Sequence, residues 1–199
     1  TGQQRLPGFD EAWETRRLGD VLERTTNGTT YRSASSDGVP ITRIETIADG
    51  TIDLDKVGHA YHTPELDEYL LQEGDILFSH INSIDHIGKV AYFSGNSRLY
   101  HGMNLLLLRV KPGVSSRFVF YLLKSEQGRR KVRSLAKQAV NQASVNTSEV
   151  KSMEVRLPLL DEQQAIATIL SDMDAEIEAL EARRNKTQNI KQGMMQELL

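Results

Sequence analysis

The sequence predicts an α+β fold in which a globular domain of short, mixed strands, residues 1–157, is followed by one long α-helix over residues 158–199. Before Pro158, short apolar runs alternate with turn-forming residues, which is typical of short strands. After Pro158 the chain has no proline, and apolar residues recur at helical spacing as far as Leu198. With 39% hydrophobic residues among 199, the chain can form one core plus an appendage.

The first elements of the domain read as strands. Residues 41–44 and 51–54 flank the turn-forming pair Asp49-Gly50, and we expect a β-hairpin there. Residues 75–78 predict a buried strand, and residues 104–110 form a nearly continuous apolar run that predicts another. We expect one more strand between these two, at residues 89–93.

In the second half of the domain, the sequence predicts two helices followed by a strand. Residues 118–123 and 128–136 predict two helices, the second with basic residues between its apolar positions. Residues 152–157 alternate between polar and apolar side chains, which predicts a last strand.

The C-terminal helix carries a heptad pattern. We expect Asp161 to cap its N-terminus, with Glu162 in the first turn. The 4-3 spacing that predicts a helix–helix interface runs through Ile166, Leu170, Met173, Ile177, Leu180, Arg184, Thr187, Lys191, Met194 and Leu198. A helix of about 57 Å, at about 1.5 Å per residue, is too long to bury this stripe against one small domain. The pattern therefore indicates a partner helix in a coiled coil; a helix folded back on its own domain is the alternative.

Charge is distributed unevenly along the chain. Residues 1–85 carry 7 Lys and Arg against 16 Asp and Glu, whereas residues 86–155 carry 12 against 3. The remaining residues, 156–199, carry 5 against 8, and the total is a net charge of −3. A basic zone of this kind is typical of phosphate binding, although a solvated helix face has the same composition.

Several function classes are excluded by missing residues and motifs. The chain has no cysteine, which excludes disulfides and Cys-ligated zinc and fits a reducing cytoplasm. No apolar run approaches the roughly 18 residues that would span a membrane. Phosphate-binding loops, nucleophile elbows, zinc-protease helices and methyltransferase Asn/Asp-Pro-Pro-aromatic sequences are all missing. We therefore expect no catalytic residue, no cofactor and no metal, with His59 and His62 as loop histidines.

Two polar stretches are candidates for contact with DNA bases. The first follows the strand at residues 75–78 and contains Ser79, His80 and Asn82. The second, rich in amides, contains Lys137, Gln138, Asn141, Gln142, Ser144 and Asn146. Asn and Gln side chains can pair bidentately with adenine. Both stretches also fit hydrogen-bonded turns or loops without a ligand.

Basic residues next to these stretches are candidates for contact with phosphates. They are Lys89, Arg129, Arg130, Lys131 and Arg133. In protein–DNA complexes such cations hold the backbone while other side chains read the bases. Trp13, the one tryptophan, is expected to have a packing role.

Taken in order, a set of short motifs resembles one family. The motifs are Leu6-Pro7-Gly8-Phe9, Gly74-Asp75-Ile76-Leu77, Pro158-Leu159-Leu160-Asp161-Glu162-Gln163-Gln164-Ala165-Ile166-Ala167 and Lys191-Gln192-Gly193-Met194-Met195-Gln196-Glu197-Leu198-Leu199. They resemble the C-terminal half of the specificity subunit of a type I restriction-modification enzyme. Each motif is short, but the ordered set covers nearly the whole chain.

The resemblance implies a non-catalytic module that reads one half of a bipartite site on double-stranded DNA. In that family, two recognition domains are joined by conserved helices that pair antiparallel. Methyltransferase subunits bring S-adenosylmethionine, and a motor and endonuclease subunit uses ATP. One recognition domain is present here, so we expect an antiparallel homodimer in isolation, with Arg184, Thr187 and Lys191 setting its register.

Two other functions stay open at this point. One is a protein-interaction domain with a coiled-coil arm and no intrinsic DNA specificity; the other is a stand-alone nuclease or methyltransferase, against which the missing motifs argue. The chain is either a piece of a longer subunit or a natural half-subunit.

Overall fold

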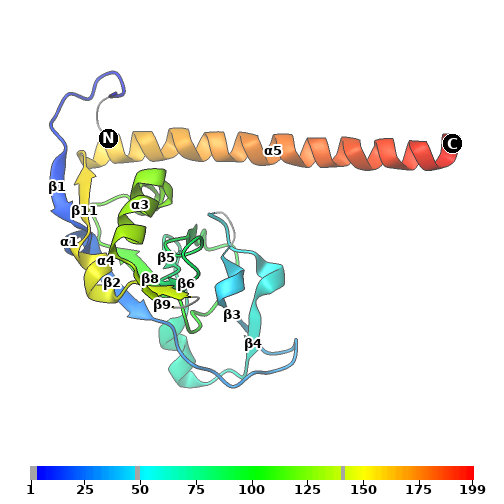
Figure 1. The fold of residues 1–199 in the computed structure, drawn as a ribbon, viewed down its shortest axis with the longest axis horizontal. Helices are drawn as coiled ribbons and strands as arrows, with labels where there is room; N and C mark the ends of the chain where they lie inside the picture. Colours follow the sequence, from blue (N-terminus) through cyan, green and yellow to red (C-terminus); the bar gives the residue numbers. More distant parts are fainter. Residues whose placement is uncertain (1–3, 48–49, 140–141) are drawn as a thin grey trace.

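A computed structural model of the chain describes residues 4–47, 50–139 and 142–199. Figure 1 shows an α+β domain with a long C-terminal helix, α5 (Leu160–Leu198), lying along one side of it. The free end of α5 continues past the domain. The predicted fold class is confirmed, and the strands that residues 75–78, 89–93 and 104–110 predicted are present with slightly shorter bounds.

The central sheet contains four antiparallel strands in the order β2-β8-β5-β7. These are β2 (Leu22–Asn27), β8 (Leu106–Val110), β5 (Ile76–Phe78) and β7 (Val90–Tyr92). Ile76 and Phe78 belong to the larger core, whereas Leu77 between them belongs to a second core. Because successive strand residues face opposite sides, β5 is covered on both faces of the sheet, which explains the uninterrupted apolar sequence of Ile76–Phe78.

Three smaller antiparallel sheets surround the central one. β1 (Glu14–Arg17) pairs with β11 (Glu154–Leu157), and β3 (Val39–Ile41) pairs with β4 (Gly58–Ala60). The third contains β6 (Ile81–Asn82), β10 (Gln142–Ser144) and β9 (Lys137–Ala139) in that order. In the described residues, parallel pairing occurs only at isolated bridges.

The domain also contains short helices, of which the one at residues 116–124 contacts both the central sheet and α5. They are α1 (Leu18–Val21), α2 (Ser116–Lys124), α3 (Glu126–Leu135) and α4 (Thr147–Ser152), with 3-10 turns η1 (Ile44–Thr46), η2 (Leu54–Lys56) and η3 (Pro64–Tyr69). Ser115 and Ser125 cap α2 and α3 by accepting hydrogen bonds from Phe118 N and Gly128 N. Within the described part of the chain, no helix has the combination of length and hydropathy that crossing a membrane requires.

The predicted hairpin across residues 41–54 is wrong. A single antiparallel bridge between Ile47 and Ile52 joins its two arms, and β3 pairs instead with β4. The Thr46 hydroxyl accepts from Arg43 N and donates to Lys56 O, so side-chain hydrogen bonds replace the strand ladder. The predicted turn residues 48–49 lie outside the described residues.

The predicted cap of the C-terminal helix is also wrong. α5 begins at Leu160, one residue before Asp161, and Leu159 at the N-cap makes no side-chain hydrogen bond. The buried side chain of Gln163 takes over part of this role, because its amide donates to Pro158 O and accepts from Ser115 N. A tertiary contact with α2 therefore stabilises the start of the helix.

Candidate nucleic-acid interface

The two polar stretches, about sixty residues apart in the sequence, meet in the β6-β10-β9 sheet. Asn82 of β6 pairs with Ala143 of β10, and Ser144 of β10 pairs with both Ile81 and Lys137. The backbone of Val145 also donates to His80 O, at 2.9 Å. The sheet therefore joins two segments that the sequence marked independently.

One face of this sheet is turned toward solvent. Ala143 is 1% exposed and belongs to the larger core, whereas its neighbours Gln142 and Ser144 are exposed. Strand residues alternate between faces, and directly paired residues share one, so Lys137 lies on the same outer face as Ser144. An amide, a hydroxyl and an ammonium group are thus presented side by side.

The first stretch forms a hydrogen-bonded turn rather than an open row of donors. Asn82 Nδ2 donates to Ser79 Oγ at 3.1 Å, and Asn82 Oδ1 accepts from Ser83 N at 2.8 Å. Ser79 is 2% exposed, and His80 is 8% exposed. Burial lowers the pKa of His80, which keeps the imidazole neutral near pH 7. These contacts favour the turn interpretation for Ser79 and Asn82.

Within the second stretch, Asn146 has a structural role. Its Oδ1 accepts from Glu149 N at 2.8 Å, and Glu149 Oε2 accepts from Asn146 N at 2.8 Å, which closes a capping box at α4. The hydrogen bond from Asn146 N, together with the charge of Lys137 at 3.3 Å, lowers the pKa of Glu149. Gln138 pairs with Ala143 through its backbone, while its side chain and the whole of Asn141 lie outside the described residues.

The basic helix α3 packs against the segment that contains β6. Gly88 has a φ of 76°, and a Cβ atom added to it would lie 2.8 Å from Val132 of α3, so glycine permits this close approach. The segment from Ser79 to Lys89, which contains β6, is closed by a hydrogen bond from Ser79 N to Lys89 O at 2.8 Å. α3 therefore packs directly on the turn that precedes Lys89.

The four α3 cations differ in what they contact. Arg130 and Arg133 lie 3.8 and 3.9 Å from Glu126, and the Arg130 side chain is 71% exposed. Lys131 donates to Glu154 O at 2.7 Å on the side toward β11. Arg129 is half-buried, and within the described residues its Nε has no hydrogen-bond partner. Arg130 and Arg133 are thus the α3 cations most available for phosphate oxygens.

A polar cleft near β3 and β4 was missed by the sequence reasoning. It has a volume of about 540 Å³, and its lining includes Tyr31, Arg43, His59 and Asn104. Nearby, the guanidinium of Arg32 lies 5.0 Å from the ring centroid of Tyr61. Aromatic and basic residues interleaved between positions 31 and 61 were a signal that could have pointed to it.

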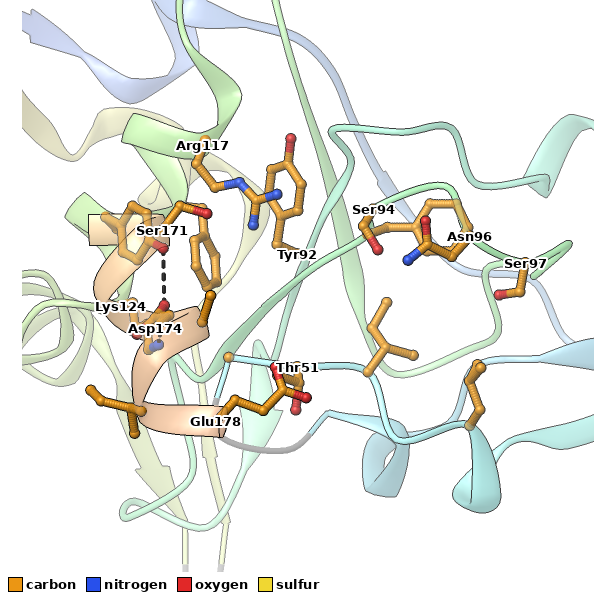
Figure 2. A pocket seen from close by; sticks show the side chains of 18 of the residues that line it. Thr51, Tyr92, Ser94, Asn96, Ser97, Arg117, Lys124, Ser171, Asp174 and Glu178 are labelled. Atoms are coloured by element: carbon orange, nitrogen blue, oxygen red, sulfur yellow. Dashed lines mark hydrogen bonds and ion pairs between the residues drawn. The ribbon is translucent and has the colours of Figure 1, made fainter. Parts of the chain in front are cut away.

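A second groove lies between residues 171–181 of α5 and the domain. It has a volume of about 870 Å³, and Figure 2 shows Asp174 directed from α5 toward Lys124 of α2. Tyr121 donates to Asp174 at 2.9 Å, and burial together with this carboxylate raises the pKa of Tyr121 to about 12. Arg117 lies 3.7 Å above the ring of Tyr92 on the opposite wall.

The predicted helix–helix interface divides into two parts. Ile166 and Leu170 are half-buried and line a cavity of the domain. The later apolar positions are exposed: Met173 54%, Ile177 54%, Leu180 57%, Met194 54% and Leu198 74%. Residues 175–198 are exposed apart from half-buried Gly193, so the alternative of a folded-back helix applies only to residues 160–174 of α5.

Comparison with known proteins agrees with this architecture. A family model described as "Type I restriction modification DNA specificity domain" matches residues 10–190. A putative type I restriction enzyme MjaX specificity subunit from Methanocaldococcus jannaschii is 45% identical over 193 residues, covering 94% of this chain and 45% of the relative. The type I restriction enzyme EcoKI specificity subunit from Escherichia coli is 24% identical over 170 residues, covering 83% and 37%. The chain therefore spans less than half of the length of these relatives.

Solved structures share the fold. The specificity subunit of a type I restriction-modification system from M. genitalium matches with a TM-score of 0.63 and 17% identity over 90% of this chain and 43% of that chain. The HsdS subunit from Thermoanaerobacter tengcongensis matches with a TM-score of 0.58 and 18% identity over 88% and 41%. With a family match across most of its length, the chain belongs to the type I restriction-modification DNA specificity domains.

Proposed function

We propose that this chain reads one half of a bipartite DNA site and thereby directs a type I restriction-modification complex to its targets. The observation that carries the proposal is the β6-β10-β9 sheet, whose outer face exposes Lys137, Gln142 and Ser144, while the cation-bearing helix α3 ends at Leu135, two residues before β9 begins. Such an arrangement can combine phosphate contacts with base contacts.

In the proposed mechanism, Arg130 and Arg133 hold phosphates while the outer face of β10 enters the major groove. Gln142 offers an amide that can pair with adenine, and Ser144 and Lys137 offer donors suited to guanine or thymine edges. Lys137 is held near Glu149 at 3.3 Å, a surface contact that a phosphate or a base can replace at small cost.

In this proposal, partner subunits carry out methylation and DNA cleavage. The relatives are specificity subunits, and we infer that this chain recognises DNA while a methyltransferase subunit supplies S-adenosylmethionine and a restriction subunit supplies ATP-driven cleavage. The exposed second half of α5 provides a surface for these partners and for a second specificity half. In isolation we expect two chains to pair antiparallel through α5.

The test is to reconstitute the chain with its cognate methyltransferase subunit and map methylated sites across a genome. We expect one short sequence to recur in all methylated sites. Gln142→Ala should then relax or shift one base position of that sequence, because the amide that pairs with a base is lost. Gln196→Ala, which removes an exposed amide on α5 far from the sheet, should leave the methylated sequence unchanged.

Two outcomes contradict the proposal. Methylation without a common sequence would indicate a protein-interaction module with no DNA specificity. A common sequence that Gln142→Ala leaves intact would place base recognition elsewhere in the domain.

A further inference from the structure

Two sets of polar contacts hold α5 against the domain, one at each end of the segment that the domain covers. At the start of the helix, buried Glu162 accepts from Nε and Nη2 of Arg5, at 2.7 Å each. Further along, Asp174 accepts from the Tyr121 hydroxyl at 2.9 Å and from Lys124 Nζ at 3.3 Å. At about 1.5 Å per residue, these two anchors lie about 18 Å apart along the helix axis.

Asp174 is the last point at which the domain holds α5. The last apolar side chain of α5 that the domain covers is Leu170, and residues 175–198 are exposed apart from half-buried Gly193. In the described part of the chain, the hydrogen bonds and ion pairs between α5 and the domain also end at Asp174. The groove of about 870 Å³ between the domain and residues 171–181 (Figure 2) leaves room for a pivot about the anchor at Glu162.

The donors that face Asp174 are connected to the central sheet through aromatic packing. The ring of Tyr121 lies 5.1 Å from that of Phe120, and Lys124 Nζ lies 5.6 Å from the Phe120 ring centroid. Phe120 in turn packs edge-on against Tyr92 of β7, at 5.7 Å between ring centroids. The Asp174 carboxylate therefore connects α5, through α2, to the sheet whose strand β5 leads into β6 of the proposed reading face.

The length of α5 amplifies any change in the angle between helix and domain. Residues 162–198 span about 54 Å at about 1.5 Å per residue, so a pivot of about 10° displaces the far end by about 9 Å. Since one base pair occupies about 3.4 Å along DNA, this displacement corresponds to about three base pairs. A small rotation at the second anchor thus becomes a large change in where a joined domain meets DNA.

We propose that Asp174, Tyr121 and Lys124 are positioning residues that fix the angle between the domain and α5, and thereby the number of base pairs tolerated between two half-sites. The inference rests on the proposed function, because spacing matters only where two domains are joined through α5 and read one bipartite site. The length of α5 sets how far apart the two domains lie, and the Asp174 contact sets how precisely.

The chemistry of the contact suits this role. Burial together with the carboxylate raises the pKa of Tyr121 to about 12, so its hydroxyl stays protonated and donates at neutral pH. A hydrogen bond to a charged acceptor is also stronger and more directional than one between neutral groups. The Asp174 side chain is 45% exposed, so its ion pair with Lys124 adds little to the stability of the fold. Variants at Asp174 should therefore fold.

The angle is measured between two spin labels in the full chain, which has no native cysteine. Ser36→Cys in an exposed turn of the domain and Asn189→Cys in exposed α5 provide the attachment points. The labelled chain is mixed with excess unlabelled chain, so that only distances within one chain are recorded. We expect Asp174→Ala to broaden or shift the distance distribution by several ångströms.

Two matched variants separate the contact from the charge. Asp174→Asn retains an oxygen that accepts from Tyr121 and should preserve the wild-type distribution. Glu178→Ala removes a carboxylate that lines the same groove one turn further along α5, and it should also preserve the distribution. Tyr121→Phe keeps the ring but removes the donor, so it should reproduce the effect of Asp174→Ala.

Methylation mapping tests the consequence for DNA. In a complex reconstituted with the cognate methyltransferase subunit, Asp174→Ala should leave the half-site sequence unchanged. Methylation of sites with one base pair more or fewer between the half-sites should rise about fivefold relative to the preferred spacing, as expected for the loss of one hydrogen bond. Asp174→Asn and Glu178→Ala should keep a single spacing. A merely structural defect would instead lower methylation of all sites equally.

An unchanged distance distribution in Asp174→Ala overturns the inference, whatever the DNA result. A broadened distribution with a single, unchanged spacing also overturns it, because the angle then does not control the spacing. Failure of the proposed function has a different signature: the wild-type complex methylates without a common sequence, while the distance distributions still report whether Asp174 fixes the angle.

Discussion

Residues 160–174 of α5 lie against the domain, whereas residues 175–198 are exposed apart from half-buried Gly193, although the same 4-3 pattern runs through both parts (Figure 1). Polar anchors hold the first half: buried Glu162 accepts from Arg5 at 2.7 Å and from Trp13 at 3.2 Å, and Asp174 accepts from Tyr121. The second half has no comparable anchor within the described residues. Periodicity therefore identifies the interface face of a helix, while individual polar contacts decide which part of it the domain holds.

Acid should produce the largest effect, and it should act on the domain rather than on α5, because every histidine lies in the domain and none in α5. Burial lowers the pKa of His101 from 6.5 to about 4, with smaller contributions from Arg24 and His80. The folded-state pKa lies below the unfolded one, so this stability is present above pH 6.5 and is lost as the pH falls toward 4. We expect the free energy of unfolding to fall by about 3 kcal/mol across this window.

The measurement is urea unfolding of the domain at pH 7, 5.5 and 4.5, followed by Trp13 fluorescence. His101→Gln should flatten the pH dependence, whereas His86→Gln, which replaces an exposed histidine, should leave it unchanged. A pH dependence that survives His101→Gln would assign the acid sensitivity to other groups.

Removing a polar anchor should have the next largest effect. Gln163→Ala leaves Ser115 N without its acceptor and deletes the hydrogen bond to Pro158 O, so we expect a loss of about 2 kcal/mol in the free energy of unfolding. Gln196→Ala, the same substitution in the second half of α5, should change this free energy by less than about 0.5 kcal/mol. Equal effects of the two substitutions would contradict the division of α5.

The polar centre of the interface should control register rather than affinity. Replacing Arg184, Thr187 and Lys191 together by Leu should tighten dimerisation about tenfold, because apolar layers replace polar ones. The same variant should lose its unique register, so that two cysteine pairs that differ by one heptad, L170C/M194C and I177C/M194C, both cross-link on oxidation in its background, whereas only one of them should cross-link in the parent chain. Tighter pairing with the original cross-link pattern would show that these residues do not set the register.

The smallest expected effect concerns charge. In a reconstituted complex, Arg130→Ala should reduce the slope of log affinity against log salt concentration by about 0.9, the value for one phosphate contact. Arg183→Ala, in the second half of α5, should leave the slope unaltered. A wild-type complex whose DNA affinity does not depend on salt would favour the protein-interaction alternative.

The fold was largely predictable where a residue pattern is compatible with only one kind of secondary structure. Residues 76–78 are apolar on both faces because two cores cover β5, and this produced a correct strand prediction. The hairpin at residues 41–54 failed because the Thr46 hydroxyl bonds two backbone groups, a contact that strand propensity does not report. The cap failed for a similar reason, since Gln163 reaches the loop before α2.

The candidate site was only partly predictable. Residue type marked both polar stretches, but it did not distinguish exposed Gln142 and Ser144 from Asn146, whose side chain caps α4. Nor did it show that Asn82 and Ser79 bond to each other. The type of a side chain shows whether it can contact DNA. The hydrogen bonds that form on folding decide which of these side chains remain available.

The local sequence pattern was enough to establish the α+β class, the length of α5 and the face of α5 that forms the interface. The periodicities of strands and helices depend only on residues that are close together in the chain. The meeting of β6 with β10, the position of α3 beside Gly88 and the cavity at the start of α5 were decided by tertiary structure. These features join segments far apart in the chain. Their formation depends on which surfaces the core leaves uncovered, and no local pattern carries that information.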